Sequence, residues 1–256
     1  MDKTYTDEEL DRLEQEEHEY IKEQIALMII LLNSLYHDLE TEFRSFYQKY
    51  GKNGIVTYQD ARKWTSNSDH RKRLTVLLLL LGDSFTTLRD NLASPFDSLL
   101  RGVIAKESEF FEVDVDADDF INSGWGADNL NWITRLENDI DLWLYNVSKD
   151  IKQSMVKRES IDDVLENLNQ RFVSMEKILT SLGLSESTAT GSMARRRIFD
   201  KLGVTKYKFY AREDERTCEH CGALHGLIFP ISAYEIGVSA SPIHPRCRCW
   251  EVPIQD

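Results

Sequence analysis

The sequence has few cysteines, few prolines and no long apolar run. These shortages limit the classes of protein to which it can belong. Its 256 residues include 4 cysteines and 5 prolines. The most apolar runs, residues 25–32 and 76–81, are far shorter than the roughly 20 residues that a membrane-spanning helix needs. The amino-terminus lacks the basic and apolar regions of a secretory signal. We therefore expect a cytosolic start and no membrane partner.

Positive charge is also in short supply. The net charge is -13, because 31 lysines and arginines face 44 aspartates and glutamates. Such an acidic surface repels phosphate, which disfavours non-specific nucleic-acid binding by the whole molecule. The strongest local basic signal is Arg195, Arg196 and Arg197. A helix spreads three consecutive side chains around its axis, so they form no flat patch. They indicate either a solvated face paired with carboxylates or a local contact with nucleic acid or an acidic partner.

Helical periodicity is abundant. Apolar residues recur every three or four positions over residues 8–50, in a second helix that opens at Ser68 or Asp69, and over residues 130–157. A brief helix is expected from Thr57 to Lys63, and Pro95 predicts a kink or a break in the second long helix.

Two further helices are expected before residue 204. The first begins at Ser160 and stops at Gly183, and the second is capped by Ser185 and ends at Gly203. The alternating acids Asp114, Asp116 and Asp118 invite comparison with a calcium loop. An EF-hand needs glycine at the sixth position and glutamate at the twelfth, which are missing, so we expect a solvated loop.

The period changes near residue 204. Residues 204–211, 227–229 and 249–252 are rich in β-branched and aromatic side chains and predict a small antiparallel sheet. The predicted fold is therefore mainly α, with long amphipathic helices followed by a small C-terminal α+β module. We expect an N-terminal helical region over 1–122, a helical bundle region over 123–203, and a Cys/His module over 204–256.

All four cysteines lie in that last segment, with most of the chemistry of the chain. Cys218 and Cys221 form a Cys-x-x-Cys turn whose two thiolates can face one ion. Cys247, with either Cys249 or His244, could complete a tetrahedral zinc site. We expect Asp214 and Arg216 to fix the turn before the first pair by hydrogen bonds or an ion pair.

Other interpretations of the cysteines stay open. The thiols could pack the small sheet in reduced form, form a disulfide after assembly, or serve as a redox dithiol, although no βαβ unit is evident for the last. Cys221 or Cys247 could pair with a nearby histidine as a nucleophile. A zinc-hairpin nuclease would need a helix after His244, where only twelve residues remain.

Several segments of the last fifty residues carry a resemblance to a known family. They are Gly203-Val204-Thr205-Lys206-Tyr207, Ala211, Asp214-Glu215-Arg216-Thr217-Cys218-Glu219-His220-Cys221, Leu224-His225-Gly226-Leu227-Ile228-Phe229 and Pro242-Ile243-His244-Pro245-Arg246-Cys247-Arg248-Cys249. They resemble the C-terminal signature of the Mu F-like head morphogenesis family of tailed phages. The stretch Trp125-Gly126-Ala127-Asp128-Asn129 and its following helices are also similar, so the resemblance covers about residues 125–254.

The sequence departs from the family at His225, where relatives commonly have aspartate. The first cysteine position is often serine or threonine in relatives, so the family fold does not require a metal held by all four cysteines.

The resemblance implies a structural, non-enzymatic minor head protein. Its expected partners are the portal protein and the major capsid or scaffolding protein, with packaged double-stranded DNA as a further contact. The expected location is inside the head of the virion, and the host cytoplasm during assembly. The alternative is a zinc-hairpin nuclease or a zinc-dependent nucleic-acid-binding protein of phage origin.

Overall fold

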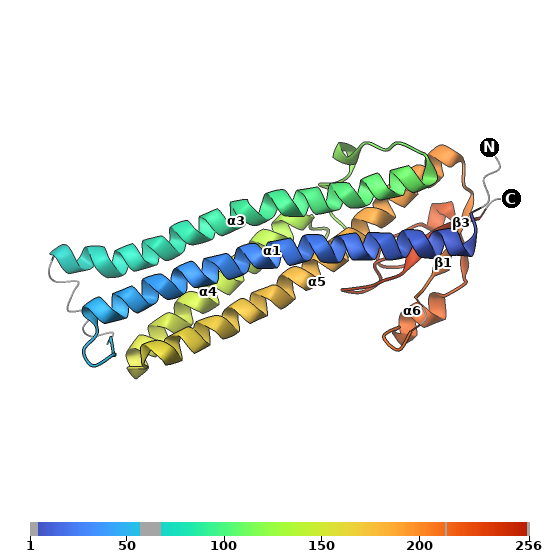
Figure 1. Cartoon of the computed structure of the whole chain (residues 1–256). Coiled ribbons are helices and arrows are strands. Elements are labelled where there is room, and N and C mark those ends of the chain that lie inside the picture. The colour runs from blue at the N-terminus through green and yellow to red at the C-terminus, as the bar shows by residue number, and fades with distance from the viewer. Residues whose placement is uncertain (1–4, 57–67, 213, 255–256) are drawn as a thin grey trace. The chain divides into compact units, whose positions relative to one another are not determined.

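The computed structural model describes residues 5–56, 68–212 and 214–254, and of residues 7, 50 and 68–86 it describes the backbone alone. Figure 1 shows its long helices, which are α1 (Asp7–Tyr50), α3 (Ser68–Phe111), α4 (Trp132–Lys157) and α5 (Ile161–Leu202). The shorter elements are the 3-10 turns η2 (Ala117–Asp119) and η3 (Ile231–Ala233), helix α6 (Glu219–Leu224), and strands β1 (Lys206–Tyr210), β2 (Ile228–Pro230) and β3 (Trp250–Ile254). The predicted fold class is confirmed.

The chain divides into two compact units. The sheet unit consists of Met1–Ala26, Pro95–Arg135 and Thr180–Asp256, and the helical unit consists of Leu27–Ser94 and Leu136–Leu179. Each long helix contributes one segment to each unit. The division at residues 122 and 203 stays a prediction.

The sheet unit is closed by an antiparallel sheet in the order β2-β1-β3. Tyr207 and Phe209 alternate with more exposed residues along β1, and both are fully buried. Phe209 packs in one cluster with Cys221, Cys247 and Cys249. The alternation that predicted this strand therefore also places one of its faces against the sulfur atoms.

The helical unit has a core of apolar stripes from its helices. Phe172 of α5 lies at its centre, with ring centroids 4.9 Å from Trp143 of α4 and 5.2 Å from Tyr36 of α1. The Trp143 indole N–H donates to the Arg171 carbonyl over 2.7 Å. The stripes predicted from the spacing of Met28 and Leu32 in α1, and of Trp143 in α4, are buried as expected.

The expectation of two helices on either side of Gly183 was wrong, because α5 is continuous from Ile161 to Leu202. Gly183 serves packing instead. A Cβ atom there would lie 2.8 Å from two side-chain carbons of Ile25 on α1, so glycine lets the two helices approach closely. Ser185 does not cap a helix, since its hydroxyl donates to the Ser181 carbonyl one turn earlier.

Three further local predictions concern Pro95, residues 57–63 and the acidic loop. Pro95 lies inside α3, which is continuous through it. The helix expected over residues 57–63 lies outside the described residues. The acidic loop contains η2, where the Asp116 carboxylate accepts a hydrogen bond from the Asp118 N–H over 3.0 Å and Arg101 pairs with Asp118 at 2.7 Å. In the part of the chain that the structure describes, no helix is long and apolar enough to cross a membrane.

Candidate metal centre

The first arm of the centre is the turn that opens α6. Cys218 is the N-cap residue, and its sulfur accepts a hydrogen bond from the Cys221 N–H over 3.3 Å. The Gly222 N–H donates to the Cys218 carbonyl over 2.9 Å, which closes the turn. A sulfur that accepts a backbone N–H is favoured as thiolate, and the amide lowers the pKa of Cys218. The turn therefore presents two sulfurs from one compact element.

The second arm is the loop before β3. The Cys247 N–H donates to the His244 carbonyl over 3.1 Å, and the intervening Arg246 has a positive φ of 61°. This turn brings the Cys247 sulfur to 3.8 Å from the Cys221 sulfur. The arms thus meet, although 26 residues separate these two cysteines.

The structure gathers all five predicted ligands into two overlapping groups. Cys218, Cys221 and His244 form one, and Cys221, Cys247 and Cys249 form the other, with the candidate ligand atoms of each group within 4.8 Å of one another. All four cysteines are free thiols. These Cys/His groups could hold a metal ion, and sulfur with imidazole is a donor set that suits zinc.

Burial and hydrogen bonds make the sulfurs unequal. A hydrogen bond from the Cys249 thiol lowers the pKa of Cys247 to about 5. The same bond, together with burial, raises the pKa of Cys249. Burial, followed by the neighbouring Cys247 sulfur, raises the pKa of Cys221 to about 12. The hydrogen bond therefore favours the thiolate form of Cys247, and a thiolate is the form that binds metal.

His244 is oriented by the chain next to it. Its Nδ1 lies 2.8 Å from the Pro245 carbonyl oxygen. A histidine whose Nδ1–H donates to a carbonyl keeps Nε2 as its ligand atom, an arrangement common around bound metals.

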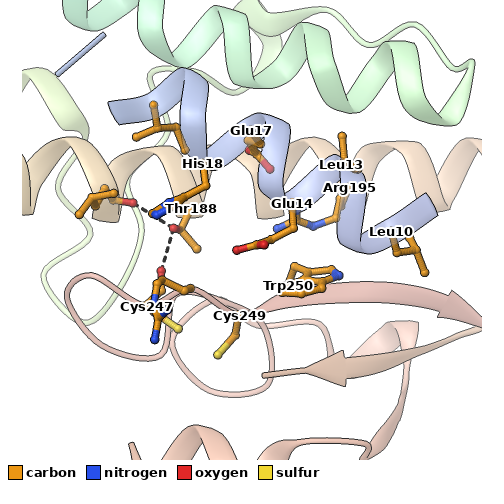
Figure 2. A pocket seen from close by; sticks show the side chains of 13 residues that line it. Leu10, Leu13, Glu14, Glu17, His18, Thr188, Arg195, Cys247, Cys249 and Trp250 are labelled. Carbon is orange, nitrogen blue, oxygen red and sulfur yellow. Dashed lines mark hydrogen bonds between the residues drawn. The ribbon is translucent and has the colours of Figure 1, made fainter. Parts of the chain in front are cut away.

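Side chains of helix α5 form hydrogen bonds with the backbone of the second arm. The Thr188 hydroxyl donates to the Cys247 carbonyl over 3.0 Å, and the Ser185 hydroxyl accepts from the Arg246 N–H over 2.9 Å. Figure 2 shows Thr188 above Cys247. Both residues line a small pocket of about 50 Å³, together with side chains of α1 and other side chains of α5. Short polar side chains on α5 therefore position the backbone that carries two of the cysteines.

Asp214 fixes the turn before the first pair, as expected. Its carboxylate accepts the Arg216 N–H over 2.9 Å and pairs through both oxygens with Arg248, at 2.5 and 2.6 Å. The Arg248 guanidinium holds the pKa of Asp214 well below its usual range. Arg216 takes part through its backbone, and Arg248, which the sequence did not single out, supplies the charge.

The other two nearby histidines lie outside both groups. His225 faces the sheet, where its Nδ1 lies 3.1 Å from the Ala211 carbonyl oxygen, and its ring is 5.0 Å from the Tyr210 ring. His220 is exposed on α6.

One comparison with known protein families gives a match that includes the Cys/His centre. Residues 145–252 match the model of the family described as phage Mu protein F like protein. The match confirms the resemblance of this segment to the Mu F-like head morphogenesis family, which is a family of structural phage head proteins. No curated protein and no solved structure matches the chain.

Within the Mu F-like segment, the three consecutive arginines do not form one solvated face. Arg195 is buried, and it donates to Glu107 through Nη1 and to Glu251 through Nε, the latter over 3.1 Å. Arg196 pairs with Asp200 one turn later. Sequence reasoning missed Glu107 and Glu251. The available signal was the 3-4-3 spacing of Ser185, Thr188, Ser192 and Arg195, which puts one polar stripe on a helix.

Glu251 is fully satisfied, whereas Glu107 is not. Besides Arg195, Glu251 accepts from the Tyr234 hydroxyl over 3.0 Å and from the Ser241 N–H over 2.5 Å. The second oxygen of the buried Glu107 carboxylate has no hydrogen-bond partner among the described residues. The Glu17 carboxylate lies near the Glu107 carboxylate, because both reach the same point beside Gly191. A Cβ atom placed on Gly191 would be 3.2 Å from Glu17 Oε1 and 3.4 Å from Glu107 Oε1. Three carboxylates thus surround one guanidinium.

The Trp125 loop that resembled the family is fastened to the Mu F-like segment. The Trp125 indole N–H donates to Glu186 over 2.8 Å, and Arg135 pairs with the same carboxylate at 2.7 Å. The Arg135 guanidinium also lies 4.3 Å from the Trp125 ring centroid and donates to Asp128 over 2.5 Å. The Trp-Gly-Ala-Asp motif is therefore a structural fastening, without reactive groups of its own.

Proposed function

We propose that this chain is a minor head protein of a tailed bacteriophage, associated with the portal and taking part in procapsid assembly, head morphogenesis or DNA delivery. The observation that carries the proposal is the family match over residues 145–252, which includes both arms of the cysteine centre. The expected partners are the portal protein and the major capsid or scaffolding protein. The protein acts inside the head, after assembly in the host cytoplasm.

Deletion of the gene from a phage that encodes it tests this proposal. We expect heads that form with altered number or shape, or that deliver DNA poorly, and we expect the tagged chain to be retained by purified portal rings. Heads that keep their number, shape, DNA content and infectivity without the chain would overturn the proposal. Plasmid cleavage with divalent metal, lost in His244→Ala, would instead establish the nuclease alternative.

We further propose that the Cys/His groups hold one zinc ion, with Cys218, Cys221 and Cys247 as three ligands and either His244 or Cys249 as the fourth. The convergence of both arms, the thiolate character of Cys247 and the orientation of His244 support this choice. Four protein ligands leave no open position, so the ion would close the fold of the module and would not activate water.

Metal analysis of the purified chain measures this directly. We expect about one zinc ion per chain, the number that a closed four-ligand site holds. Cys221→Ser should abolish binding, and Glu219→Ser in the same turn is the matched control. Of His244→Ala and Cys249→Ala, the variant that loses zinc identifies the fourth ligand. Retention of zinc by Cys221→Ser would contradict the assignment.

A further inference from the structure

Helix α4 carries a second stripe of large side chains that faces away from the core. Leu142, Tyr145, Lys149, Lys152 and Val156 follow one another at alternating spacings of three and four residues, and all five are exposed. Leu142, Tyr145 and Val156 are 62, 66 and 64% exposed. This spacing is the seam of a helix that packs on another helix. We call these five residues the α4 face.

The α4 face is both apolar and basic. A groove of about 510 Å³ runs beside Tyr145, Lys149, Lys152 and Val156. Among the described residues, no carboxylate forms an ion pair with Lys149 or Lys152. The α4 face has apolar side chains at both ends and two lysines between them. It therefore complements a helix that presents apolar side chains followed by carboxylates.

Helix α1 offers such a face in the helical unit. Residues 24–36 carry no charged side chain. Leu27, Ile30 and Leu31 are 52, 62 and 39% exposed, although the same segment buries Met28 and Leu32 on its other side. A stripe of exposed apolar side chains on a helix is normally covered by another element or by a partner. Further along the same side, Asp38 and Glu42 are exposed. We call Leu27, Ile30, Leu31, Asp38 and Glu42 the α1 face.

The two faces run in the same direction within the helical unit, because both helices are antiparallel to α5. Near the end of α1, Arg44 pairs with Asp162 at 3.1 Å, and Tyr36, earlier in α1, packs on Phe172, later in α5. Helix α4 ends just before α5 begins, and its Asp150 pairs with Arg171. Aligned in parallel, Leu27 and Ile30 meet Leu142 and Tyr145, and Asp38 meets Lys152.

We propose that the α1 face of one copy packs on the α4 face of the next copy, so that the protein assembles head to tail. The two faces differ, so each copy uses one as donor and the other as acceptor, and such a contact builds a ring or an open array. Pairing of two α4 faces about a two-fold axis would instead place Lys149 against Lys149, which like charges disfavour. The contact does not depend on the proposed role in a phage head.

Charge exchange between the faces tests this contact in the full-length protein. The variants are Lys149→Glu with Lys152→Glu, and Asp38→Lys with Glu42→Lys. We expect the wild type to show a mass above the monomer in light scattering at high concentration. Each double variant alone should be monomeric, because its two faces now carry the same charge. An equimolar mixture of the two variants should assemble again, because every contact in the mixture joins opposite charges.

Lys177→Glu is the matched control, since Lys177 is exposed on α5 outside both faces. It should assemble like the wild type. Recovery in the mixture shows that the variants are folded, because an unfolded variant would not assemble with its partner. A wild type that is monomeric at all concentrations, a double variant that still assembles, or a mixture that stays monomeric would each overturn the proposal.

Discussion

At the residue scale, the carboxylates around the buried Arg195 outnumber its single positive charge. Burial, followed by the neighbouring Glu107 carboxylate, raises the pKa of Glu17 to about 8. Burial also raises the pKa of Glu107 to about 7, although the Arg195 guanidinium opposes the rise. One positive charge cannot balance Glu17, Glu107 and Glu251 in a buried site. Near neutral pH the folded protein therefore retains a proton that the unfolded chain has already lost.

This imbalance predicts a stability that falls as pH rises. A carboxyl with a raised folded-state pKa stabilises the fold fully below its ordinary pKa of 4.5, and this contribution is lost progressively as pH rises from about 4.5 to about 8. The midpoint of thermal unfolding should decrease over that window. Glu17→Gln should raise the free energy of unfolding above that window by about 1 kcal/mol or more, and change it little near pH 5. Glu16→Gln, an exposed neighbour, is the control, and an equal gain at both pH values would contradict the explanation.

Gly183 gives a second prediction at this scale. In most helix interiors, replacing glycine by alanine stabilises by roughly 1 kcal/mol. At Gly183 the added methyl would meet the buried Ile25 side chain, so Gly183→Ala should destabilise the protein by about 1 kcal/mol in urea denaturation. Gly222→Ala in α6 meets nothing within 4 Å and should be neutral or stabilising. Equal effects of the two substitutions would show that α1 adjusts without cost.

At the element scale, Glu186 joins two segments of the sheet unit. Its carboxylate is nearly fully buried and binds both Trp125 and Arg135. Glu186→Ala would leave the part-buried Trp125 indole N–H without its acceptor and would remove one acceptor of the Arg135 guanidinium. The expected loss is about 2–4 kcal/mol in the free energy of unfolding, measured by urea denaturation.

Limited proteolysis should also show cleavage near residues 122–131 in the same variant, because the fastening of this loop to α5 is lost. Glu166→Ala on the exposed surface of α5 is the matched control and should change neither observable. A stable Glu186→Ala variant with an intact loop would show that Asp128 and the Trp125 carbonyl, which also accepts from Arg135, are enough to hold Arg135.

At the scale of the whole molecule, metal removal should act on one part of the chain. If zinc closes the Cys/His centre, a strong chelator should speed hydrogen exchange in residues 206–254 and lower the midpoint of thermal unfolding. Exchange in residues 136–157 of the helical unit should stay the same. Cys221→Ser should already exchange fast and should not respond to the chelator. Identical exchange with and without chelator in the wild type would contradict a structural role for the metal.

The sequence by itself determined most of the helices and strands and the place of the chemistry. The spacing of apolar residues, with a period of 3.6 in a helix and 2 in a strand, is a local property of the chain. It therefore predicted a helix over residues 8–50 and a strand over residues 204–211. The close spacing of Cys218 to Cys221 and of His244 to Cys249 is also local. This spacing made a shared centre predictable. The same residues carried the resemblance to the family, and residues 145–252 match the model of that family.

Only the tertiary structure decided which partner each side chain received. Gly183 and Ser185 carry ordinary signals for the end and start of a helix, yet α5 continues through both. Gly183 packs against Ile25 of α1, and the Ser185 hydroxyl accepts a hydrogen bond from the Arg246 N–H. Arg195 is the same residue type as its exposed neighbour Arg197, and only its position beside Glu107 and Glu251 buries it. Such choices depend on groups far apart in the chain, whose approach is set by packing, and no local pattern records them.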